Sequence, residues 1–302
     1  MSVSSSGSAF ASVAHGNASV NRAGAHLDES ALALEQVLMG WFRDHGSAVI
    51  GYSGGVDSTY LASVALDALG ADKMVAVLGM SASVPSRQAE EARDRAILLG
   101  FPLRVVDTHE LDDASYASNP TNRCYHCKSE LWHRLTPIAQ ELGYAVTCDG
   151  TNADDVRDYR PGMRAASEQE VRAPLAETGL TKEQIRFLSK RRYLPTWNAP
   201  AAPCLASRLP YGVAVTRERL ARVDRAETAL RALGIAGDMR VRHHAELARV
   251  ELAPGILDEW LLPERTALIE QAVRSAGFPR VVLDLAGFRS GSLNVLHGIP
   301  RA

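Results

Sequence analysis

The chain has 302 residues, of which 46% are hydrophobic and 23% are charged, and its formal net charge at pH 7 is −2. These values are typical of a globular protein with one large domain or two ordinary ones, and they weigh against a wide nucleic-acid surface, which needs a basic excess. No apolar stretch reaches the ~20 residues that span a bilayer, and four cysteines are too few for a disulfide scaffold.

The N-terminal segment, residues 1–28, is rich in Ser, Ala and Gly. It lacks the basic flank and the apolar centre of a secretory signal. We therefore expect residues 1–28 to form a disordered arm, and we expect the protein to be cytoplasmic. A first helix is predicted over residues 29–44.

Strand-like apolar runs then alternate with helix-like segments. Strands are predicted at residues 48–52, 74–78, 103–106 and 145–148, and helices at 58–69, 85–99 and 125–142. Strands separated by helices indicate an α/β fold with a doubly wound parallel sheet. Ligands of such sheets bind beyond the carboxyl ends of the strands, where the loop after residue 52, Met80 and Gly150 are expected to meet.

The pattern changes after a less regular connector that contains several prolines. Helices are predicted at residues 216–233 and 265–276, a pair of strands at 239–243 and 248–252, and a further strand at 280–285. This arrangement predicts a second, smaller α+β domain. We therefore divide the chain after its arm into a nucleotide domain, residues 29–199, and a C-terminal domain, residues 200–302.

Six consecutive residues after the first strand form the clearest motif: Ser53, Gly54, Gly55, Val56, Asp57 and Ser58. Glycines let a ligand approach backbone N–H groups, and the start of the following helix offers unpaired N–H donors to a phosphate. Asp57 is a candidate ligand for the Mg²⁺ that accompanies a nucleoside triphosphate. The motif is not of the Walker type, because no Gly-Lys-Ser/Thr follows. An ordinary turn is the alternative, but the strand–turn–helix context favours nucleotide binding.

Three cysteines form a second candidate site. Cys124 and Cys127 lie three positions apart at the start of a predicted helix, and Cys204 lies in the connector. Three thiolates are one short of a closed zinc site, but they can hold a 4Fe–4S cluster with one iron open to an extra ligand. The spacing alone also allows a redox pair, or a zinc half-site completed by His126 or Cys148. Cys148 lies in an apolar strand, which favours a place in the core.

Charged residues near other strands have two interpretations each. Asp154 and Asp155 follow the fourth strand. One of them could supply a second carboxylate to Mg²⁺, or both could be turn and helix-cap residues. Arg240 and Arg242 share one face of a predicted strand, and guanidinium groups suit phosphate. By itself, a solvated strand face paired with acids such as Glu251 is the simpler interpretation.

Four segments, taken together, resemble one family. They are residues 53–58, 123–128, 150–155 with 158–162, and 203–208, joined by the Gly-Phe-Arg-Ser-Gly-Ser stretch at 287–292. The combination resembles the LarE family, ATP-dependent sulfur transferases of the PP-loop ATP pyrophosphatase superfamily that make the nickel-pincer nucleotide cofactor of lactate racemase and related enzymes. The PP-loop alone is shared with NAD, GMP and asparagine synthetases and with tRNA-thiolating enzymes. The cysteine segments and the terminal stretch therefore carry the specificity of the resemblance, which covers residues 29–298.

The resemblance implies a reaction on pyridinium-3,5-biscarboxylic acid mononucleotide. ATP adenylates a ring carboxylate and pyrophosphate leaves, a sulfur nucleophile then displaces AMP, and the cycle repeats on the second carboxylate to give the bis-thiocarboxylic acid. Residues 53–58, Met80 and Gly150 are then the expected ATP contacts, with Asp57 as the ligand of Mg²⁺.

The family has two sulfur strategies. In one, a single cysteine at the position of Cys204 gives up its own sulfur and becomes dehydroalanine, so the protein acts once. In the other, cysteines at the positions of Cys124, Cys127 and Cys204 hold a 4Fe–4S cluster that carries an exchangeable sulfide. This chain has all three cysteines, which predicts the cluster form. The sulfur donor that reloads the cluster is not apparent from the sequence.

The same resemblance implies further roles. Arg240 and Arg242 become candidates for the phosphate of the mononucleotide, and Arg208, Glu227 and Arg289 become possible contacts in the site. It also implies a homo-oligomer, a hexamer in the family, that acts on a small molecule and needs neither nucleic acid nor a membrane.

Three rival functions share parts of this pattern. A PP-loop tRNA thiolase can use the same ATP chemistry and the same three cysteines, but it needs a basic face for RNA. A PP-loop amidotransferase needs an ammonia source, and the sequence offers no candidate glutaminase domain. A nucleotide-binding iron–sulfur carrier would bind ATP without forming AMP.

Overall fold

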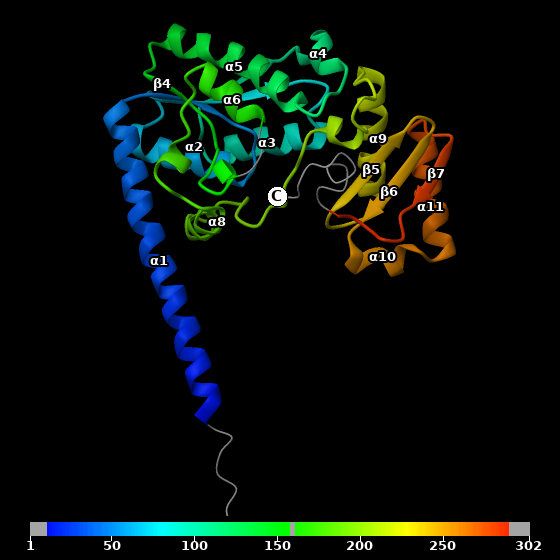
Figure 1. Cartoon of the computed structure of the whole chain (residues 1–302), viewed down its shortest axis with the longest axis horizontal. Coiled ribbons are helices and arrows are strands. Elements are labelled where there is room, and N and C mark those ends of the chain that lie inside the picture. The colour runs from blue at the N-terminus through cyan, green and yellow to red at the C-terminus, as the bar shows by residue number, and fades with distance from the viewer. Residues whose placement is uncertain (1–10, 158–160, 290–302) are drawn as a thin grey trace, which may run out of the picture.

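The computed structural model describes residues 11–157 and 161–289, and the side chains of residues 28–156 and 161–289. These residues form two separate β-sheets, each packed against helices (Figure 1). The larger sheet has four strands, all parallel, in the order β3-β2-β1-β4. Its strands are β1 (Ala48–Gly51), β2 (Met74–Met80), β3 (Leu103–Asp107) and β4 (Val146–Cys148). The predicted α/β fold with a parallel sheet is confirmed.

Helices occupy the connections of this sheet, as the sequence pattern predicts. They are α2 (Val56–Leu69) after β1, α3 (Ser86–Leu98) after β2, and α4 (Ala114–Ala117) and α5 (Arg123–Leu142) between β3 and β4. A short 3₁₀ turn, η1 (Glu110–Asp112), precedes α4. Because β1 pairs with β2 on one side and β4 on the other, the loop that leaves β1 lies between its two neighbours at the carboxyl edge.

The first helix is longer than predicted. It is α1 (Ala11–His45), which begins ahead of the predicted start at residue 29. Several alanines and the absence of proline between residues 11 and 28 make helical backbone favourable there. The proposed disordered arm over residues 1–28 and the two domain boundaries stay predictions.

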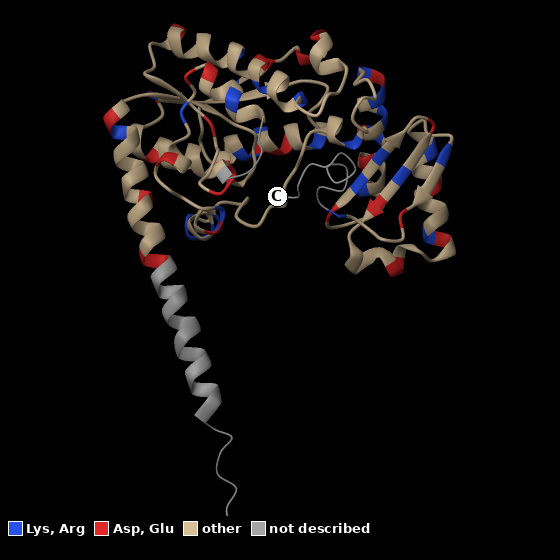
Figure 2. Ribbon diagram, in the orientation of Figure 1, with Lys and Arg blue, Asp and Glu red and all other residues tan. Residues whose placement is uncertain are grey.

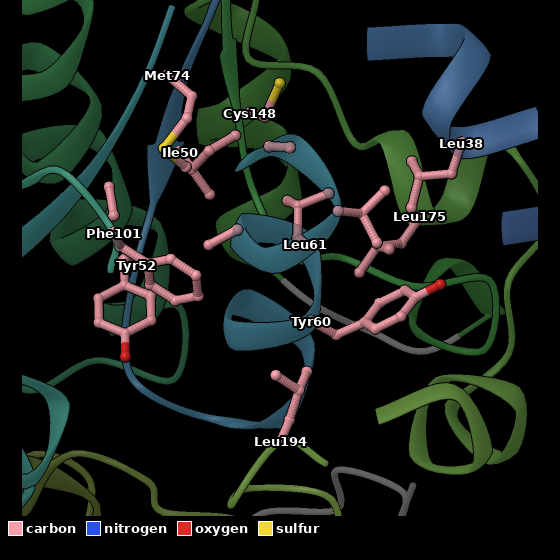
Figure 3. Close-up of a cluster of buried hydrophobic side chains, with 14 of the residues drawn as sticks. Leu38, Ile50, Tyr52, Tyr60, Leu61, Met74, Phe101, Cys148, Leu175 and Leu194 are labelled. Atoms are coloured by element: carbon pink, nitrogen blue, oxygen red, sulfur yellow. The ribbon is translucent and has the colours of Figure 1, made fainter. Parts of the chain in front are cut away.

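The hydrophobic core beside the larger sheet is packed around α2 (Figure 3). Leu61 and Tyr60 of α2 are fully buried, and so are Leu38 of α1 and Ile50 of β1. Burying each such side chain contributes about 1.5–3 kcal/mol. Helix α2, which follows the nucleotide loop, is therefore held on several sides by apolar contacts. These contacts fix the position of the loop.

The connector contains more helix than the sequence pattern suggested. It forms η2 (Asp155–Arg157), α6 (Pro161–Glu168), α7 (Pro174–Glu177), α8 (Lys182–Arg191) and η3 (Leu205–Arg208). The prolines of the connector predict irregular structure. Pro161 and Pro174 are instead the first residues of helices, where proline costs no hydrogen bond. A capping box between Thr181 and Gln184 starts α8.

The smaller sheet has three strands in the order β5-β6-β7. They are β5 (Met239–His244), β6 (Leu247–Leu252) and β7 (Arg280–Leu283), packed with α9 (Arg217–Ala232), α10 (Pro254–Trp260) and α11 (Pro263–Ser275). The predicted antiparallel pair, β5 with β6, is present, and β7 joins β6 in parallel. Helix α10 was not predicted. Within the residues that the structure describes, none of the helices has the length and apolar composition of a bilayer-spanning segment.

Candidate active site

The loop between β1 and α2 requires glycine at its second position. Gly54 has φ +72°, and a Cβ atom placed on it would lie 2.6 Å from the Cβ of Ala92 in α3. A side chain would therefore meet both an unfavourable backbone conformation and a steric clash. The Arg95 guanidinium donates to the Gly54 carbonyl at 3.1 Å, so α3 also stabilises the loop through a hydrogen bond.

The two serines of this loop close it on itself. The Ser58 hydroxyl accepts from the Ser53 backbone N–H at 3.2 Å, and the two hydroxyl oxygens are 3.1 Å apart. No side chain caps the N-terminus of α2 at Gly55. The first N–H groups of α2 are therefore left without a side-chain cap, and the partial positive charge of the helix start lies at the loop.

Asp57 lies at the rim of the loop and already has a cationic neighbour. Its Oδ2 atom is 2.5 Å from the Lys182 ammonium, and Asn152 Nδ2 approaches its Oδ1 atom at 3.5 Å. Both charged side chains are partly exposed, with 24% and 37% of the Asp57 and Lys182 side chains accessible. Sequence reasoning missed Lys182. The capping signal of Thr181 and Gln184, which places Lys182 at the first position of a helix, offered a way to find it.

The end of β4 lies directly against the loop. A Cβ atom on Gly150 would come within 3.1 Å of the Ser58 backbone nitrogen, so glycine allows this close approach. Asp154 accepts from the Lys182 backbone N–H at 2.8 Å, and Asp155 accepts from the Asn152 backbone N–H at 3.2 Å. In this structure both carboxylates accept backbone hydrogen bonds, which agrees with their interpretation as turn and cap residues. Residues 158–160 lie outside the described residues.

Met80 ends β2 at the same edge of the sheet, and its carbonyl accepts from the Thr108 backbone N–H at 2.8 Å. The strand leads into Ser83, whose carbonyl accepts from the Leu205 backbone N–H at 2.8 Å. Because Leu205 directly follows Cys204, this contact brings the third cysteine to the edge where the nucleotide loop lies.

Two of the three cysteines of the sequence motif, Cys127 and Cys204, pack against the same buried hydrophobic cluster, which includes Tyr116, Leu205 and Val241. The pKa of the Cys127 thiol is raised first by burial, and then by negative charge at Glu110, Cys204 and Cys124, although Lys128 opposes the shift.

In residues 28–156 and 161–289, no three His, Cys, Asp or Glu side chains converge as the ligands of one ion, and this holds for the three cysteines as well. Cys148 is fully buried in the sheet, as predicted for a core residue. His126 lies 3.4 Å from Asp113 and lines a cleft of about 270 Å³ between η1, α5 and α6. A 4Fe–4S cluster makes a different demand, because each cysteine binds its own iron atom.

The residue directly before Cys124 at the start of α5 is a buried arginine. Arg123 is 5% exposed and donates to Asn119 Oδ1 and, at 3.2 Å, to the Ala206 carbonyl. Burial by itself lowers the pKa of this guanidinium, but negative charge at Cys204 and Cys124 reverses the shift, and the net pKa is raised. No carboxylate in the described part of the chain lies within ion-pairing distance of Arg123.

A second buried arginine fixes the Cys204 segment. Arg208 forms two 2.9 Å hydrogen bonds with the carboxylate of Glu227 and donates to the Cys204 carbonyl at 3.0 Å. Glu227 also accepts from the Val241 backbone N–H at 3.0 Å. The pair therefore joins α9, β5 and the turn that carries Cys204.

Two further arginines, Arg240 and Arg242, lie in β5 and are buried. Lys and Arg positions are blue on the ribbon of this strand (Figure 2). Arg242 donates to Glu251 at 2.9 Å, so the predicted pairing is present, but both side chains are buried rather than solvated. Arg240 is 7% exposed and has no carboxylate within ion-pairing distance among the described residues. Burial and the like charges of Arg208 and Arg242 lower its pKa to about 10.

The loop after β7 also reaches this arginine. The ring of Phe288 lies 4.8 Å from the Arg240 guanidinium carbon, and the Phe288 N–H donates to the Leu252 carbonyl at 2.7 Å. Arg289 follows next and is exposed. Ser290, Gly291 and Ser292, which the sequence motif includes, lie outside the described residues.

Comparison with known proteins finds some relatives that match most of this chain and others that match only part of it. The family model described as NAD synthase matches residues 33–131. A pyridinium-3,5-bisthiocarboxylic acid mononucleotide synthase of Lactiplantibacillus plantarum is 35% identical over 85% of this chain and 92% of its own length. An uncharacterised protein of Synechocystis sp. is 45% identical over 84% of this chain and 94% of its own length. An argininosuccinate synthase of Haloarcula marismortui is 26% identical, but over 50% of this chain and 38% of that enzyme.

Proposed function

Because the chain belongs to the family of the pyridinium-3,5-bisthiocarboxylic acid mononucleotide synthase, a family of ATP-dependent enzymes with a PP-loop, we propose that it converts pyridinium-3,5-biscarboxylic acid mononucleotide to the bis-thiocarboxylic acid. The observation that carries the proposal is the contact between Leu205 and Ser83, which brings the Cys204 segment to the carboxyl edge of the nucleotide sheet. Activation of a carboxylate and delivery of sulfur need such a shared edge.

The first half-reaction activates a ring carboxylate. Its oxygen attacks the α-phosphorus of ATP, the bond to the β-phosphate oxygen breaks, and pyrophosphate leaves. The N–H groups at the start of α2 and the hydroxyls of Ser53 and Ser58 would bind the departing pyrophosphate. Lys182 would turn from Asp57 to a phosphate, which leaves the Asp57 carboxylate for Mg²⁺. Mg²⁺ would supply charge neutralisation of the phosphates.

The second half-reaction transfers sulfur. A sulfur nucleophile attacks the acyl carbon, the bond from that carbon to the AMP oxygen breaks, and AMP leaves with the electron pair. The thiolates of Cys124, Cys127 and Cys204 would hold a 4Fe–4S cluster, which supplies an open iron position for the sulfide to be transferred. Arg208 and Glu227 fix the backbone of Cys204, so the turn that carries the thiolate keeps its place through repeated cycles.

The substrate phosphate belongs on β5 in this proposal. Arg240 combines deep burial with the absence of a carboxylate partner in the described residues, so a buried phosphate would satisfy it. Arg242 already pairs with Glu251 and contributes a second positive charge nearby. The phosphate of a mononucleotide is a dianion, which suits two guanidinium groups.

The decisive experiment measures AMP, pyrophosphate and product with the purified, anaerobically reconstituted protein. We expect AMP formation that depends on the pyridinium dicarboxylate, and several equivalents of thiocarboxylate per chain when sulfide is supplied. AMP formation with less than one sulfur per chain, and a chain lighter by one H₂S, would assign single use of Cys204. ATP binding without AMP formation would assign an iron–sulfur carrier and overturn the proposal.

A cytoplasmic location and assembly into a homo-oligomer, a hexamer in the family, belong to the same proposal. Size-exclusion chromatography with light scattering tests the assembly. A monomer at micromolar concentration would contradict that part of the proposal and leave the chemistry standing.

A further inference from the structure

We propose that Arg186 of α8 is a positioning residue that holds the segment leading to Cys204 in a fixed place beside the nucleotide loop. This segment is residues 197–203, which we call the Cys204 strap, and it contains neither helix nor strand. The inference rests on the proposed function, because it assigns a role to a residue that supports the same sulfur site.

Both arms of the Arg186 guanidinium bind the backbone at the start of the strap. Its Nη1 atom donates to the Trp197 carbonyl and its Nη2 atom to the Ala199 carbonyl, each at 2.9 Å. A charged, planar donor that binds two acceptors at once fixes the direction of the chain as well as its distance. The ammonium group of lysine has no such fork, so it cannot reproduce both contacts in this geometry.

The rest of the strap is also held by side chains rather than by a helix or a sheet. Residues 200–203 are exposed, and two of the four are prolines, which have no backbone N–H to donate. The Ala201 carbonyl accepts from Arg240 at 3.3 Å, and the Pro203 carbonyl accepts from Arg208 at 2.6 Å. Guanidinium groups from three elements therefore hold the strap in succession, first from α8, then from β5 and then from η3.

Helix α8 gives Arg186 a rigid base. The side chains of Ile185 and Leu188 are fully buried in the core beside the larger sheet. Lys182 lies four residues before Arg186 and therefore on the same face of α8, and its ammonium is 2.5 Å from Asp57 Oδ2. One helix face thus carries a contact with the nucleotide loop and a contact with the strap. This arrangement sets the distance between the two parts of the site.

A purely structural role for Arg186 makes a different prediction. The fork would then only stabilise the fold, so its removal should slow both half-reactions alike, or neither. A positioning role predicts that the first half-reaction, which needs the nucleotide loop, keeps its rate while sulfur transfer slows. Arg186→Gln removes the charge and the fork, and Arg186→Lys keeps the charge without the fork. Arg191→Gln changes an exposed arginine at the end of the same helix and is the matched control.

The first measurement needs neither substrate nor iron. Hydrogen exchange of the full chain, read by mass spectrometry on peptides that cover the strap, reports how often its hydrogen bonds open. Two N–H groups of the strap, at Trp197 and Ala199, donate within turns. We expect them to exchange about tenfold faster in Arg186→Gln, less than tenfold faster in Arg186→Lys, and at the wild-type rate in Arg191→Gln.

Exchange in β1 and α2 should stay unchanged in all variants, which shows that each is folded. If Arg186→Gln exchanges faster throughout this core, Arg186→Lys decides in its place. Wild-type exchange of the strap in a folded Arg186 variant would overturn the proposal.

The second measurement separates the two half-reactions. Exchange of labelled pyrophosphate into ATP, dependent on the pyridinium dicarboxylate, reports the first, and thiocarboxylate formed in a single turnover reports the second. We expect Arg186→Gln to keep pyrophosphate exchange within about twofold and to slow sulfur transfer about tenfold, because the sulfur-bearing segment is misplaced. An equal loss in both half-reactions, or no loss in either, would overturn the proposal. If the wild type shows no pyrophosphate exchange, the proposed function fails, and hydrogen exchange of the strap alone decides the role of Arg186.

Discussion

The nucleotide loop and the group of arginines at and near β5 differ in how far their charged side chains are buried. The loop consists of backbone N–H groups and hydroxyls, and its charged pair, Asp57 with Lys182, is partly exposed. On the C-terminal side, Arg208, Arg240 and Arg242 are each less than a tenth exposed. A ligand that comes and goes with its own cation suits the first arrangement. A fixed anion that must be held out of water suits the second.

The largest expected effects would separate the two ends of the site. Asp57→Asn should lower AMP formation by about 100-fold or more, because an electrostatic contact of the reacting phosphates is lost, while bound iron stays unchanged. Cys127→Ala should lose multiple turnover and iron but keep ATP binding. Quantifying AMP, iron and nucleotide binding in both variants checks this. Loss of iron in Asp57→Asn, or repeated turnover in Cys127→Ala, would show that the two ends are not separate.

A smaller but sharper contrast lies within β5. Arg242→Leu would leave the buried Glu251 with Arg249 as its remaining described partner, so we expect a loss of about 3 kcal/mol in the free energy of unfolding. Arg240→Leu removes a charge that has no carboxylate partner in the described residues. It should change stability by less than about 1 kcal/mol and raise the KM for the mononucleotide about tenfold or more.

Urea unfolding and steady-state kinetics measure both quantities for this pair. The contrast fails if Arg240→Leu destabilises the protein as much as Arg242→Leu. It also fails if the KM for the mononucleotide is the same in Arg240→Leu and the wild type.

The smallest expected effect tests the backbone of the loop. Gly54→Ala should cost about 2 kcal/mol in the free energy of unfolding, because φ is +72° and the new Cβ would meet Ala92, and it should raise the KM for ATP. Gly40→Ala, in α1 with open space at the Cβ position, is the matched control and should stabilise the protein by about 0.5–1 kcal/mol. Equal thermal unfolding curves for the two variants would contradict the steric argument.

The same contrast explains what the sequence predicts well. The nucleotide loop is local: a buried strand, two glycines and a helix start are adjacent in the chain, so its geometry follows from short-range rules. The parallel sheet follows from the alternation of strands and helices for the same reason. Their predicted bounds lie within a few residues of those in the structure.

The remainder of the site depends on contacts between distant segments. Lys182 pairs with Asp57, which is 125 positions away in the sequence, and Arg208 pairs with Glu227, which is 19 positions away. The hydrophobic periodicity of the sequence does not predict such pairs. The burial of Arg240 and Arg242 was also missed, because two alternating arginines on a strand are typical of a solvated face until the packing of the turn after Cys204 is known.

The most direct test of the central claim is the amount of iron and acid-labile sulfide per chain after anaerobic reconstitution, with Cys204→Ala as the control. The three-cysteine account predicts about four of each per wild-type chain, as a 4Fe–4S cluster requires, and a marked loss in the control. Little or no iron in the wild type, with intact ATP binding, would contradict the cluster and assign Cys204 as a sulfur donor that acts once.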